Sequence, residues 1–377
     1  MLDNTDSNDL IVETARRFAQ ERLAPTAAAR EKAGVIEPEI IRELGEMGFL
    51  GATLSAEWGG SEIPYEIYAQ VVEEIAAGDG SVSTLVSVHN APTCEILQKY
   101  GTDAQKERWL RPLATGEKVG SFGLTESSAG SDAASVKTRA TRTNSGYTVN
   151  GSKQFISNAK IGQTTILFAV TDPEAGKKGI TAFIVDNNTP GFSVARVEHK
   201  LGQKASDSCA LSFDDMHVPD NQRIGEEGEG LKIALSTLES GRIGIAAQAV
   251  GMARAALDYA IAYAKERKQF GGKPIIEHQA VAFRLVDAKT KLAAAHEMTL
   301  KAARLKDAGK PALEAAAMAK LFASEIAEEV CSVAIQTLGG YGYLADYPVE
   351  RIYRDVRVCQ IYEGTSDIQK LILQRML

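Results

Sequence analysis

The sequence has few cysteines and histidines, and none of them forms a metal or redox motif. Among its 377 residues there are 4 cysteines and 5 histidines. Cys94, Cys209, Cys331 and Cys359 are far apart and form no C-x-x-C pair, and the histidines form no H-E-x-x-H array. Metal sites and disulfide frameworks normally show such close spacings. We therefore expect no metal site, and free thiols in a reducing compartment.

Long apolar runs and clusters of one charge are also missing. No apolar run approaches the roughly 18 residues that suggest a membrane span. The net charge is −7, and no basic cluster suggests a nucleic-acid footprint. Residues 1–10 are acidic and polar, unlike a secretory signal or an Arg-rich transit peptide. We expect a cytoplasmic protein that binds neither nucleic acid nor membrane, or a mitochondrial-matrix protein if a transit peptide was removed.

What is present divides the chain into three segments, of which the first is helical. The 44% hydrophobic content allows two or three domains. Apolar residues recur every three or four positions, as on one helix face, at Ile11, Ala15, Phe18, Ile40, Leu44 and Met47. A further helix is expected from Ser81. Asp103 is the expected N-cap of a helix over 104–110, because its carboxylate can accept from free backbone N–H groups.

Between about 122 and 226, Gly, Ser, Thr and β-branched residues dominate. Strands are predicted over 165–170, 180–185, 192–197 and 210–218. Asn150-Gly151 lies between alternating residues and predicts a hairpin turn. Short strands at this spacing favour a small antiparallel barrel or sandwich over a βαβ sheet.

Helical patterns return from about 228 to the end. Long Ala-rich segments with apolar stripes, one from Val250 to Ala264 and one from Met318 to Val333, predict a bundle. The predicted fold class is α+β. It comprises an N-terminal helical domain (1–121), a middle antiparallel β-barrel or sandwich domain (122–227) and a C-terminal four-helix bundle (228–377).

Five motifs occur on this helix–strand–helix background. They are SFGLTESSAGSD at 121–132, LGQKAS at 201–206, ERKQFG at 266–271, QTLGGYG at 336–342 and IYEGTSDIQ at 361–369. Together, and in this order, they resemble the acyl-CoA dehydrogenase family, above all its short-chain and short-branched-chain members. The resemblance covers nearly the whole chain. It implies FAD between the strand domain and the bundle, an acyl-CoA thioester on one flavin face, a homotetramer, usually a dimer of dimers, and re-oxidation by electron-transfer flavoprotein.

The resemblance also assigns FAD contacts. They are Phe122, Leu124, Thr125, Gly130, Ser131, Phe155, Ile156, Ser157, Arg267, Phe270, Gln279, Gln336, Gly339, Gly340, Thr365 and Asp367. Small residues in the loop 122–131 let backbone N–H groups approach anionic oxygens. Phe155 and Ser157 stand where relatives usually carry Trp and Thr. The planar fork of Arg267 suits a phosphate, whereas one extra residue at 271–272 affects the register of Gln279.

Each of these residues also has an ordinary structural interpretation when it is taken alone. The 122–131 segment is then a Gly/Ser turn, and Phe155 is a buried strand aromatic. Arg267 is then a surface ion-pair partner, and Gly339-Gly340 is a helix C-cap. A lone Glu363 near a C-terminus is then a solvated side chain.

By resemblance, Glu363 is the catalytic base. It would remove the α-proton of the thioester while the β-hydride passes to flavin N5, with the thioester oxygen polarised by a ribityl hydroxyl and the Glu363 N–H. The implied substrate contacts are Ser131, Glu239, Arg242, Tyr362 and Gly364. In the isovaleryl and long-chain branches the base comes from the position of Gly241, which here carries no carboxylate. We therefore expect a straight or 2-methyl-branched C4 to C6 acyl-CoA, converted to the trans-2-enoyl-CoA.

Three further expectations complete the sequence-based hypothesis. Arg354 and Asp355 are expected to form a structural ion pair. A flavin oxidase or monooxygenase on the same fold is one alternative function, although such relatives often lack the glutamate or replace it by aspartate. A non-catalytic helical scaffold that has kept the fold is the other.

Overall fold

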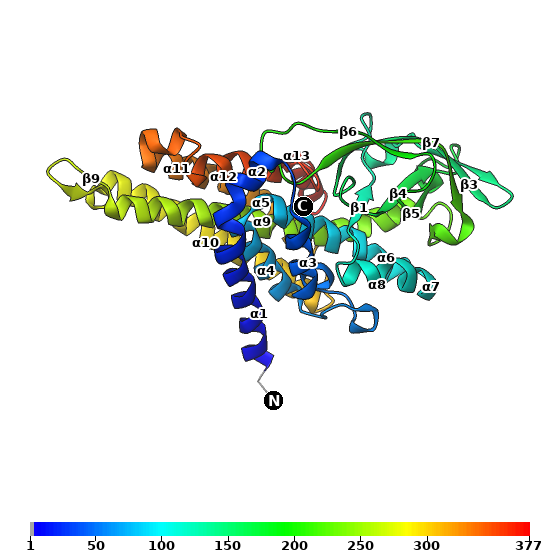
Figure 1. The fold of residues 1–377 in the computed structure, drawn as a ribbon, viewed down its shortest axis with the longest axis horizontal. Helices are drawn as coiled ribbons and strands as arrows, with labels where there is room; N and C mark the ends of the chain where they lie inside the picture. Colours follow the sequence, from blue (N-terminus) through cyan, green and yellow to red (C-terminus); the bar gives the residue numbers. More distant parts are fainter. Residues whose placement is uncertain (1–3) are drawn as a thin grey trace.

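The computed structural model describes residues 4–377 and shows helices, then a sheet, then helices along the chain (Figure 1). The expectation for residues 1–10 therefore lies partly outside the described residues. The N-terminal helices are α1 (Asn4–Phe18), α2 (Ala27–Ala33), α3 (Pro38–Glu46), α4 (Tyr65–Gly78), α5 (Gly80–Val88), α6 (Glu95–Tyr100), α7 (Asp103–Gln105) and α8 (Arg111–Ala114). Apolar side chains of α3, α4 and α5 meet in one core, and the helical pattern predicted around Ile40 and Leu44 is confirmed.

Side-chain caps fix where two of these helices begin. Asp79 caps α5, because its carboxylate accepts from the N–H groups of Ser81 (2.7 Å) and Val82 (3.2 Å). Thr102, not Asp103, caps α7. The hydroxyl of Thr102 accepts from Gln105 N, and the Gln105 side chain accepts from Thr102 N, which forms a capping box. The prediction of Asp103 as N-cap is therefore wrong by one residue.

The middle of the chain forms an eight-stranded sheet in the order β6-β7-β3-β2-β4-β5-β8, with β1 beside β4. The strands are β1 (Gly120–Gly123), β2 (Arg139–Thr143), β3 (Gly146–Ser157), β4 (Thr164–Val170), β5 (Ile180–Asp186), β6 (Phe192–Val197), β7 (Ser208–Pro219) and β8 (Arg223–Ile224). The sheet is mixed, because β1 and β2 run parallel to β4 while the other pairings are antiparallel. The four predicted strand segments correspond to β4, β5, β6 and β7, which confirms them.

The hairpin predicted at Asn150-Gly151 is wrong, because both residues lie inside β3. The turn between β2 and β3 lies at 144–145 instead. At Gly151 (φ 146°) the ladder with β7 shifts register, and a Cβ would lie 2.7 Å from the Cα of Thr138. The glycine therefore permits a close approach of two backbone segments within the sheet domain.

The C-terminal part is built on three long helices, α9 (Gly230–Glu266), α10 (Gln279–Asp307) and α11 (Leu313–Leu338), with the shorter α12 (Pro348–Val356) and α13 (Ser366–Gln374). The bundle extends away from the sheet and ends in the small hairpin of β9 (Lys268–Gln269) and β10 (Lys273–Pro274) (Figure 1). Helix α9 also packs on α4 so closely that a Cβ at Gly251 would lie 2.0 Å from Glu73 O. This order of helical, sheet and helical parts confirms the predicted fold class.

Two searches concern the described part of the chain only. No helix within residues 4–377 is long and apolar enough to cross a membrane. Among the same residues, no group of three or more His, Cys, Asp or Glu side chains is arranged to hold a metal ion.

Candidate active site

The loop that leads into α13 places Glu363 against the first third of α9. Glu363 and Gly364 are both in the left-handed region, with φ of 55° and 89°. The carboxylate reaches α9 at Gly241, where a Cβ would lie 2.6 Å from Oε2. Only a residue without a side chain at 241 therefore leaves this space to the carboxylate.

The carboxylate of Glu363 is partly buried and lies near the positive charges of Arg242 and Lys320. The residue as a whole is partly exposed, but Oε2 is buried and has no hydrogen-bond partner among the described residues. Burial raises the pKa of Glu363 to about 7, although the charges of Arg242 and Lys320 act in the opposite direction. Burial disfavours charge on the two cationic groups as well, so it lowers the pKa of Arg242 and lowers that of Lys320 to about 8.

Two side chains hold the backbone of this loop. Lys320 of α11, fully buried, donates from Nζ to Gly364 O at 2.7 Å. Gln369 of α13 donates from Nε2 to Gly364 O (2.8 Å) and Glu363 O (3.2 Å). Thr365 is the N-cap of α13, and its hydroxyl accepts from Ile368 N at 3.3 Å. The two carbonyls at the left-handed turn are thus both fixed.

Tyr362 points its hydroxyl into the protein. It donates to Gln248 Oε1 at 2.6 Å, and Gln248 Nε2 donates to Ser83 Oγ (2.7 Å) and Thr84 Oγ1 (2.9 Å). Thr84 continues the chain by donating to Gln203 Oε1. The Tyr362 hydroxyl is therefore part of a buried network, and the ring remains the part of this residue that can meet a ligand.

The ion pair predicted between Arg354 and Asp355 is wrong in its partners. The guanidinium of Arg354 pairs with Glu31 and Glu350. The carboxylate of Asp355 accepts from the backbone N–H of Gln203 instead. Because the two side chains leave α12 in different directions, each joins a different neighbouring segment.

Strand β3 and the loop after β1 form a second part of the site. Gln154 N donates to Thr125 O at 2.8 Å, and the buried Lys153 donates to Leu124 O at 3.0 Å. Next to them, Phe155 has φ 60° and is 62% exposed, whereas Ile156 is buried. The strand therefore presents a free aromatic ring beside the loop 122–131.

The other predicted residues of this region differ in exposure. Phe122 packs edge-on against Phe168, with ring centroids 5.1 Å apart. Ser157 pairs with Ser208 of β7 and is half-buried. Gly130 and Ser131 are exposed, and a Cβ at Gly130 would meet none of the described atoms within 4 Å. The outer half of the loop is thus open to a ligand.

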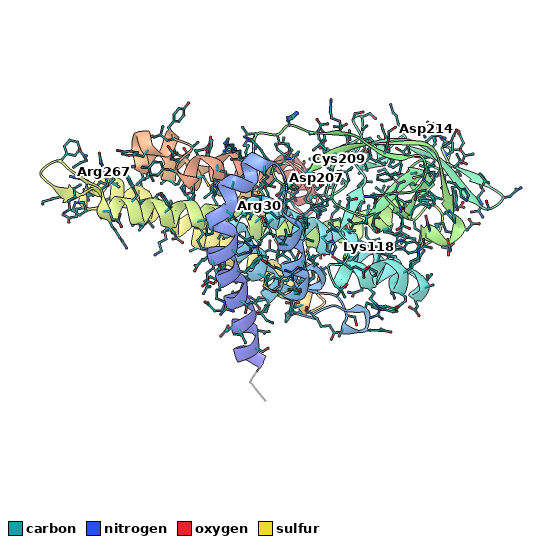
Figure 2. All side chains as sticks on the ribbon, in the orientation of Figure 1. Arg30, Lys118, Asp207, Cys209, Asp214 and Arg267 are labelled. Carbon is teal, nitrogen blue, oxygen red and sulfur yellow. The ribbon has the colours of Figure 1, made fainter. Side chains whose placement is uncertain are left out.

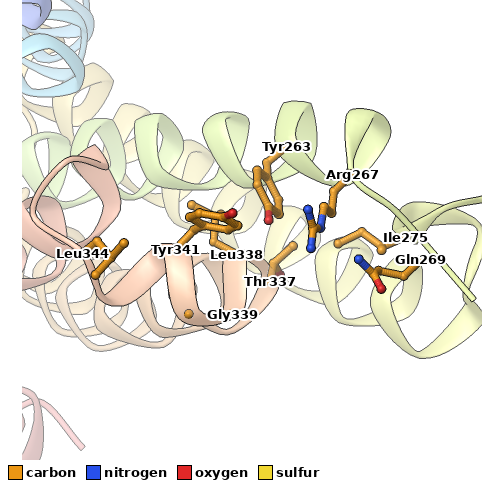
Figure 3. A pocket seen from close by; sticks show the side chains of 10 residues that line it. Tyr263, Arg267, Gln269, Ile275, Thr337, Leu338, Gly339, Tyr341 and Leu344 are labelled. Carbon is orange, nitrogen blue, oxygen red and sulfur yellow. The ribbon is translucent and has the colours of Figure 1, made fainter.

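A third group lies at the far end of the bundle (Figure 3). A pocket of 440 Å³ is lined by Tyr263, Arg267, Gln269, Ile275, Thr337, Leu338, Gly339, Gly340, Tyr341 and Leu344. The Arg267 guanidinium lies 5.8 Å from the centre of the Tyr341 ring. Of the residues predicted here, Arg267, Gly339 and Gly340 line the pocket, whereas Phe270, Gln279 and Gln336 are exposed outside its lining. Within one chain this group is remote from the sheet: Arg267 lies at the tip of the bundle, far from Asp207, which directly precedes β7 (Figure 2).

The remaining predicted contacts lie close to Glu363 in sequence or on α9. Arg242 is 6% exposed, and its Nε has no partner in the part of the chain that the structure describes. Glu239 is half-buried two residues before Gly241 on α9, and Asp367 is exposed in the first turn of α13. The free Phe155 ring and the unpaired atoms of Arg242 and Glu363 fit a large cofactor and substrate with aromatic and polar parts.

Comparison with known proteins identifies the family. Models of the acyl-CoA dehydrogenase N-terminal, middle and C-terminal domains match residues 5–117, 121–216 and 228–377. The short-chain specific acyl-CoA dehydrogenase of Clostridium acetobutylicum is 42% identical over 98% of this chain and 97% of its own length. The chain belongs to the acyl-CoA dehydrogenase family. It is an oxidoreductase with FAD as its cofactor.

Solved structures of relatives have the same fold. Butyryl-CoA dehydrogenase from Megasphaera elsdenii has a TM-score of 0.96 and 42% identity, over 100% of this chain and 99% of that chain. A chain in a structure of the electron transferring flavoprotein of Acidaminococcus fermentans, a study of flavin-based electron bifurcation, has a TM-score of 0.97, 42% identity and the same coverage.

Several residues at the site of this acyl-CoA dehydrogenase were missed from sequence. Lys320, Gln248 and Gln369 all form hydrogen bonds with the segment 362–364 that carries Glu363. For Lys320 a signal was available, because it lies in a helix whose neighbouring positions are alanines such as Ala316 and Ala323. A lysine within an apolar stripe indicates a buried amine with a specific partner.

Proposed function

We propose that the protein oxidises short-chain acyl-CoA, straight or 2-methyl-branched, to the trans-2-enoyl-CoA, with Glu363 as the base. The observation that carries the proposal is the buried, unpaired Oε2 of Glu363, which lies over Gly241 and has no hydrogen-bond donor among residues 4–377. A carboxylate that forms a salt bridge is a poor base, because its proton affinity is low. An unpaired one in a dry site retains that affinity.

The pKa of Glu363 suits this role. Burial raises the pKa to about 7, so the carboxyl is partly ionised near neutral pH and can take a proton from a weakly acidic carbon. The α-proton passes to Glu363, and FAD, when bound, supplies the acceptor for the β-hydride. The N–H of Glu363 would donate to the thioester carbonyl, where negative charge increases as the proton leaves.

Other residues would bind the two ligands. The ring of Phe155, Ser157 and the loop 122–131 would contact the flavin. The buried guanidinium of Arg242 would orient the CoA part, together with Ser131, while Glu239, Tyr362 and Gly364 would border the acyl chain. Gly241 leaves room for the carboxylate on the loop, as in the short-chain and short-branched-chain members that the sequence resembles, which supports a straight or 2-methyl-branched acyl group.

The position of Arg267 supports an oligomer with shared cofactor sites. Because Arg267 and the pocket at Gly339 are remote from the sheet in one chain, they would contact the FAD of a second subunit (Figure 2). Apolar side chains are exposed at this end of the bundle, including Phe270 (87%), Phe283 (58%) and Tyr343 (86%). Such exposure is typical of an interface. We infer that the protein forms a homotetramer. We also infer that electron-transfer flavoprotein is its electron acceptor, which the likeness to a chain from a structure of such a flavoprotein supports.

Anaerobic bleaching of the flavin by a panel of acyl-CoA thioesters tests the proposal. We expect the highest kcat/KM with C4 to C6 chains, and Glu363→Gln should retain FAD while reduction slows by about 100- to 10,000-fold. Glu329→Gln, on the exposed face of α11, is the matched control and should reduce normally.

Three results would contradict the proposal. Undiminished reduction in Glu363→Gln would remove this residue from the mechanism. Highest efficiency on C12 or longer chains would exclude the substrate class. Fast re-oxidation by air and slow re-oxidation by electron-transfer flavoprotein would indicate an oxidase.

A further inference from the structure

The position of the Glu363 carboxylate depends on its backbone. Oε2 receives no hydrogen bond from the described residues, so no donor fixes the carboxylate directly. It lies against the backbone of Gly241, where even a Cβ would come within 2.6 Å of Oε2, and this contact limits movement toward α9 without providing a hydrogen bond. Whatever holds the backbone of the loop therefore determines where the base lies.

That backbone is held in a conformation that non-glycine residues avoid. Glu363 has φ 55°, and the following Gly364 has φ 89°. A non-glycine residue in this region persists where surrounding contacts enforce it. Here the contacts are the hydrogen bonds from Lys320 and Gln369 to the carbonyls of Glu363 and Gly364.

Lys320 is unusual because its amine is fully buried and donates to a backbone carbonyl. A buried ammonium is costly unless it is bonded and electrostatically compensated. The charged or titratable groups that influence it are Glu363, Arg242 of α9, Glu325 of α11 and Cys359 of the turn before the loop. Arg242 disfavours the charge, whereas an ionised Glu363 favours it.

We propose that Lys320 is a positioning residue for the base: it holds the carbonyl of Gly364 and so keeps the Glu363 carboxylate against Gly241. Its positive charge also favours the ionised form of that carboxylate. The inference rests on the proposed role of Glu363. It assigns to Lys320 two separable effects, one through the hydrogen bond and one through the charge.

Three variants of the FAD-loaded enzyme separate these effects. Lys320→Met removes the bond and the charge, and Gln369→Leu removes two bonds but leaves the charge. Lys370→Met, an exposed lysine of α13 that pairs with Glu325 at 3.5 Å, is the control. For each, bound FAD, thermal midpoint, amide hydrogen exchange of residues 361–366 and the pH profile of flavin reduction by saturating butyryl-CoA are measured.

The proposal makes a distinct expectation for each variant. Lys320→Met should reduce about 10- to 100-fold more slowly, because small misplacements of a catalytic group cost this much. Its acid limb should shift to higher pH by about one unit, because a nearby positive charge is lost. Gln369→Leu should slow reduction without that shift. Both should exchange the 361–366 amides faster than wild type, and Lys370→Met should match wild type.

Wild-type reduction and wild-type exchange in Lys320→Met would overturn the proposal. An acid limb of the pH profile that does not shift in Lys320→Met would also overturn it. The same holds if Lys320→Met and Gln369→Leu both lose bound FAD and thermal midpoint to an extent that accounts for their slow flavin reduction. Failure of the proposed function is a different result, namely normal reduction by Glu363→Gln, and the exchange measurement does not depend on it.

Discussion

Replacing Gly241 by alanine adds one methyl group directly against the Glu363 carboxylate, the proposed base. The new Cβ would lie 2.6 Å from Glu363 Oε2 and 2.9 Å from Cδ. Ordinary van der Waals contact begins at 3.4 Å, so the carboxylate must move by about 0.8 Å. The backbone cannot easily move with it, since Lys320 and Gln369 hold the loop carbonyls.

The expected effect on stability is small, and that on the reaction is large. Oε2 is the end of a flexible side chain, so it can turn away, and alanine gains about 1 kcal/mol over glycine inside a helix. A displacement of about 1 Å, however, can slow a positioned proton transfer by about 100-fold, or about 2.7 kcal/mol in activation free energy. We therefore expect Gly241→Ala to retain its thermal midpoint and bound FAD and to lose most of its flavin-reduction rate.

Gly244→Ala is the matched control for Gly241→Ala. It lies on the same helix, and its Cβ would lie 2.6 Å from the Ser87 hydroxyl oxygen, which can rotate. Both proteins are compared by stopped-flow flavin reduction with saturating butyryl-CoA and by thermal unfolding. If Gly241→Ala reduces within about threefold of Gly244→Ala, the carboxylate does not need its place over residue 241, and the reasoning is refuted.

Further expectations concern titration and buried ion pairs. Because burial raises the pKa of Glu363 to about 7, flavin reduction should accelerate as the pH rises through about 7. Ionisation of this buried carboxyl over the same rise should lower the free energy of unfolding. Replacing Glu363 by Gln should therefore raise the thermal midpoint, relative to wild type, more at about pH 8 than at about pH 5. Lys153→Met breaks a buried 2.7 Å pair with Glu126 and should cost about 3–5 kcal/mol in urea unfolding, partly recovered by adding Glu126→Gln. Arg30→Met, which breaks the buried 2.6 Å pair with Asp79, should cost a similar amount, and a loss below about 1 kcal/mol would contradict the assignment.

The elements that could be predicted from sequence are those that local patterns specify. The strand at 180–185 carries a run of β-branched and apolar residues, and β5 covers it. Gly151 shows the limit of such patterns. Its neighbour Asn150 makes the pair look like a turn, but the glycine is required because Thr138, just before β2, comes close to it across the hairpin of β2 and β3. The prediction of Asp103 as N-cap was wrong for a local reason. The reciprocal hydrogen bonds between Thr102 and Gln105 satisfy two backbone N–H groups, whereas a lone Asp103 cap would satisfy fewer.

The site was predictable where a motif carried it and unpredictable where packing did. The role of Glu363 stays a prediction, made through its neighbours in the IYEGTSDIQ motif. Lys320 and Gln248 lie 43 and 115 positions earlier, and nothing local indicates that they face the loop. Of the two partners of Arg354, Glu350 lies four residues earlier on the same helix, whereas Glu31 of α2 is brought to it only by the tertiary fold. The domain limits at 121 and 227, and the register of Gln279, stay predictions.

Gly241 and Glu363 are best understood as one feature. The carboxylate occupies the space that any side chain at 241 would need, so a base on the loop and a side chain on the helix exclude each other sterically. With Glu363 as the proposed base, the left-handed turn and its anchors, Lys320 and Gln369, serve to place the carboxylate. A chain of this fold that carried its base at 241 would therefore be free to relax the turn and to lose the buried lysine.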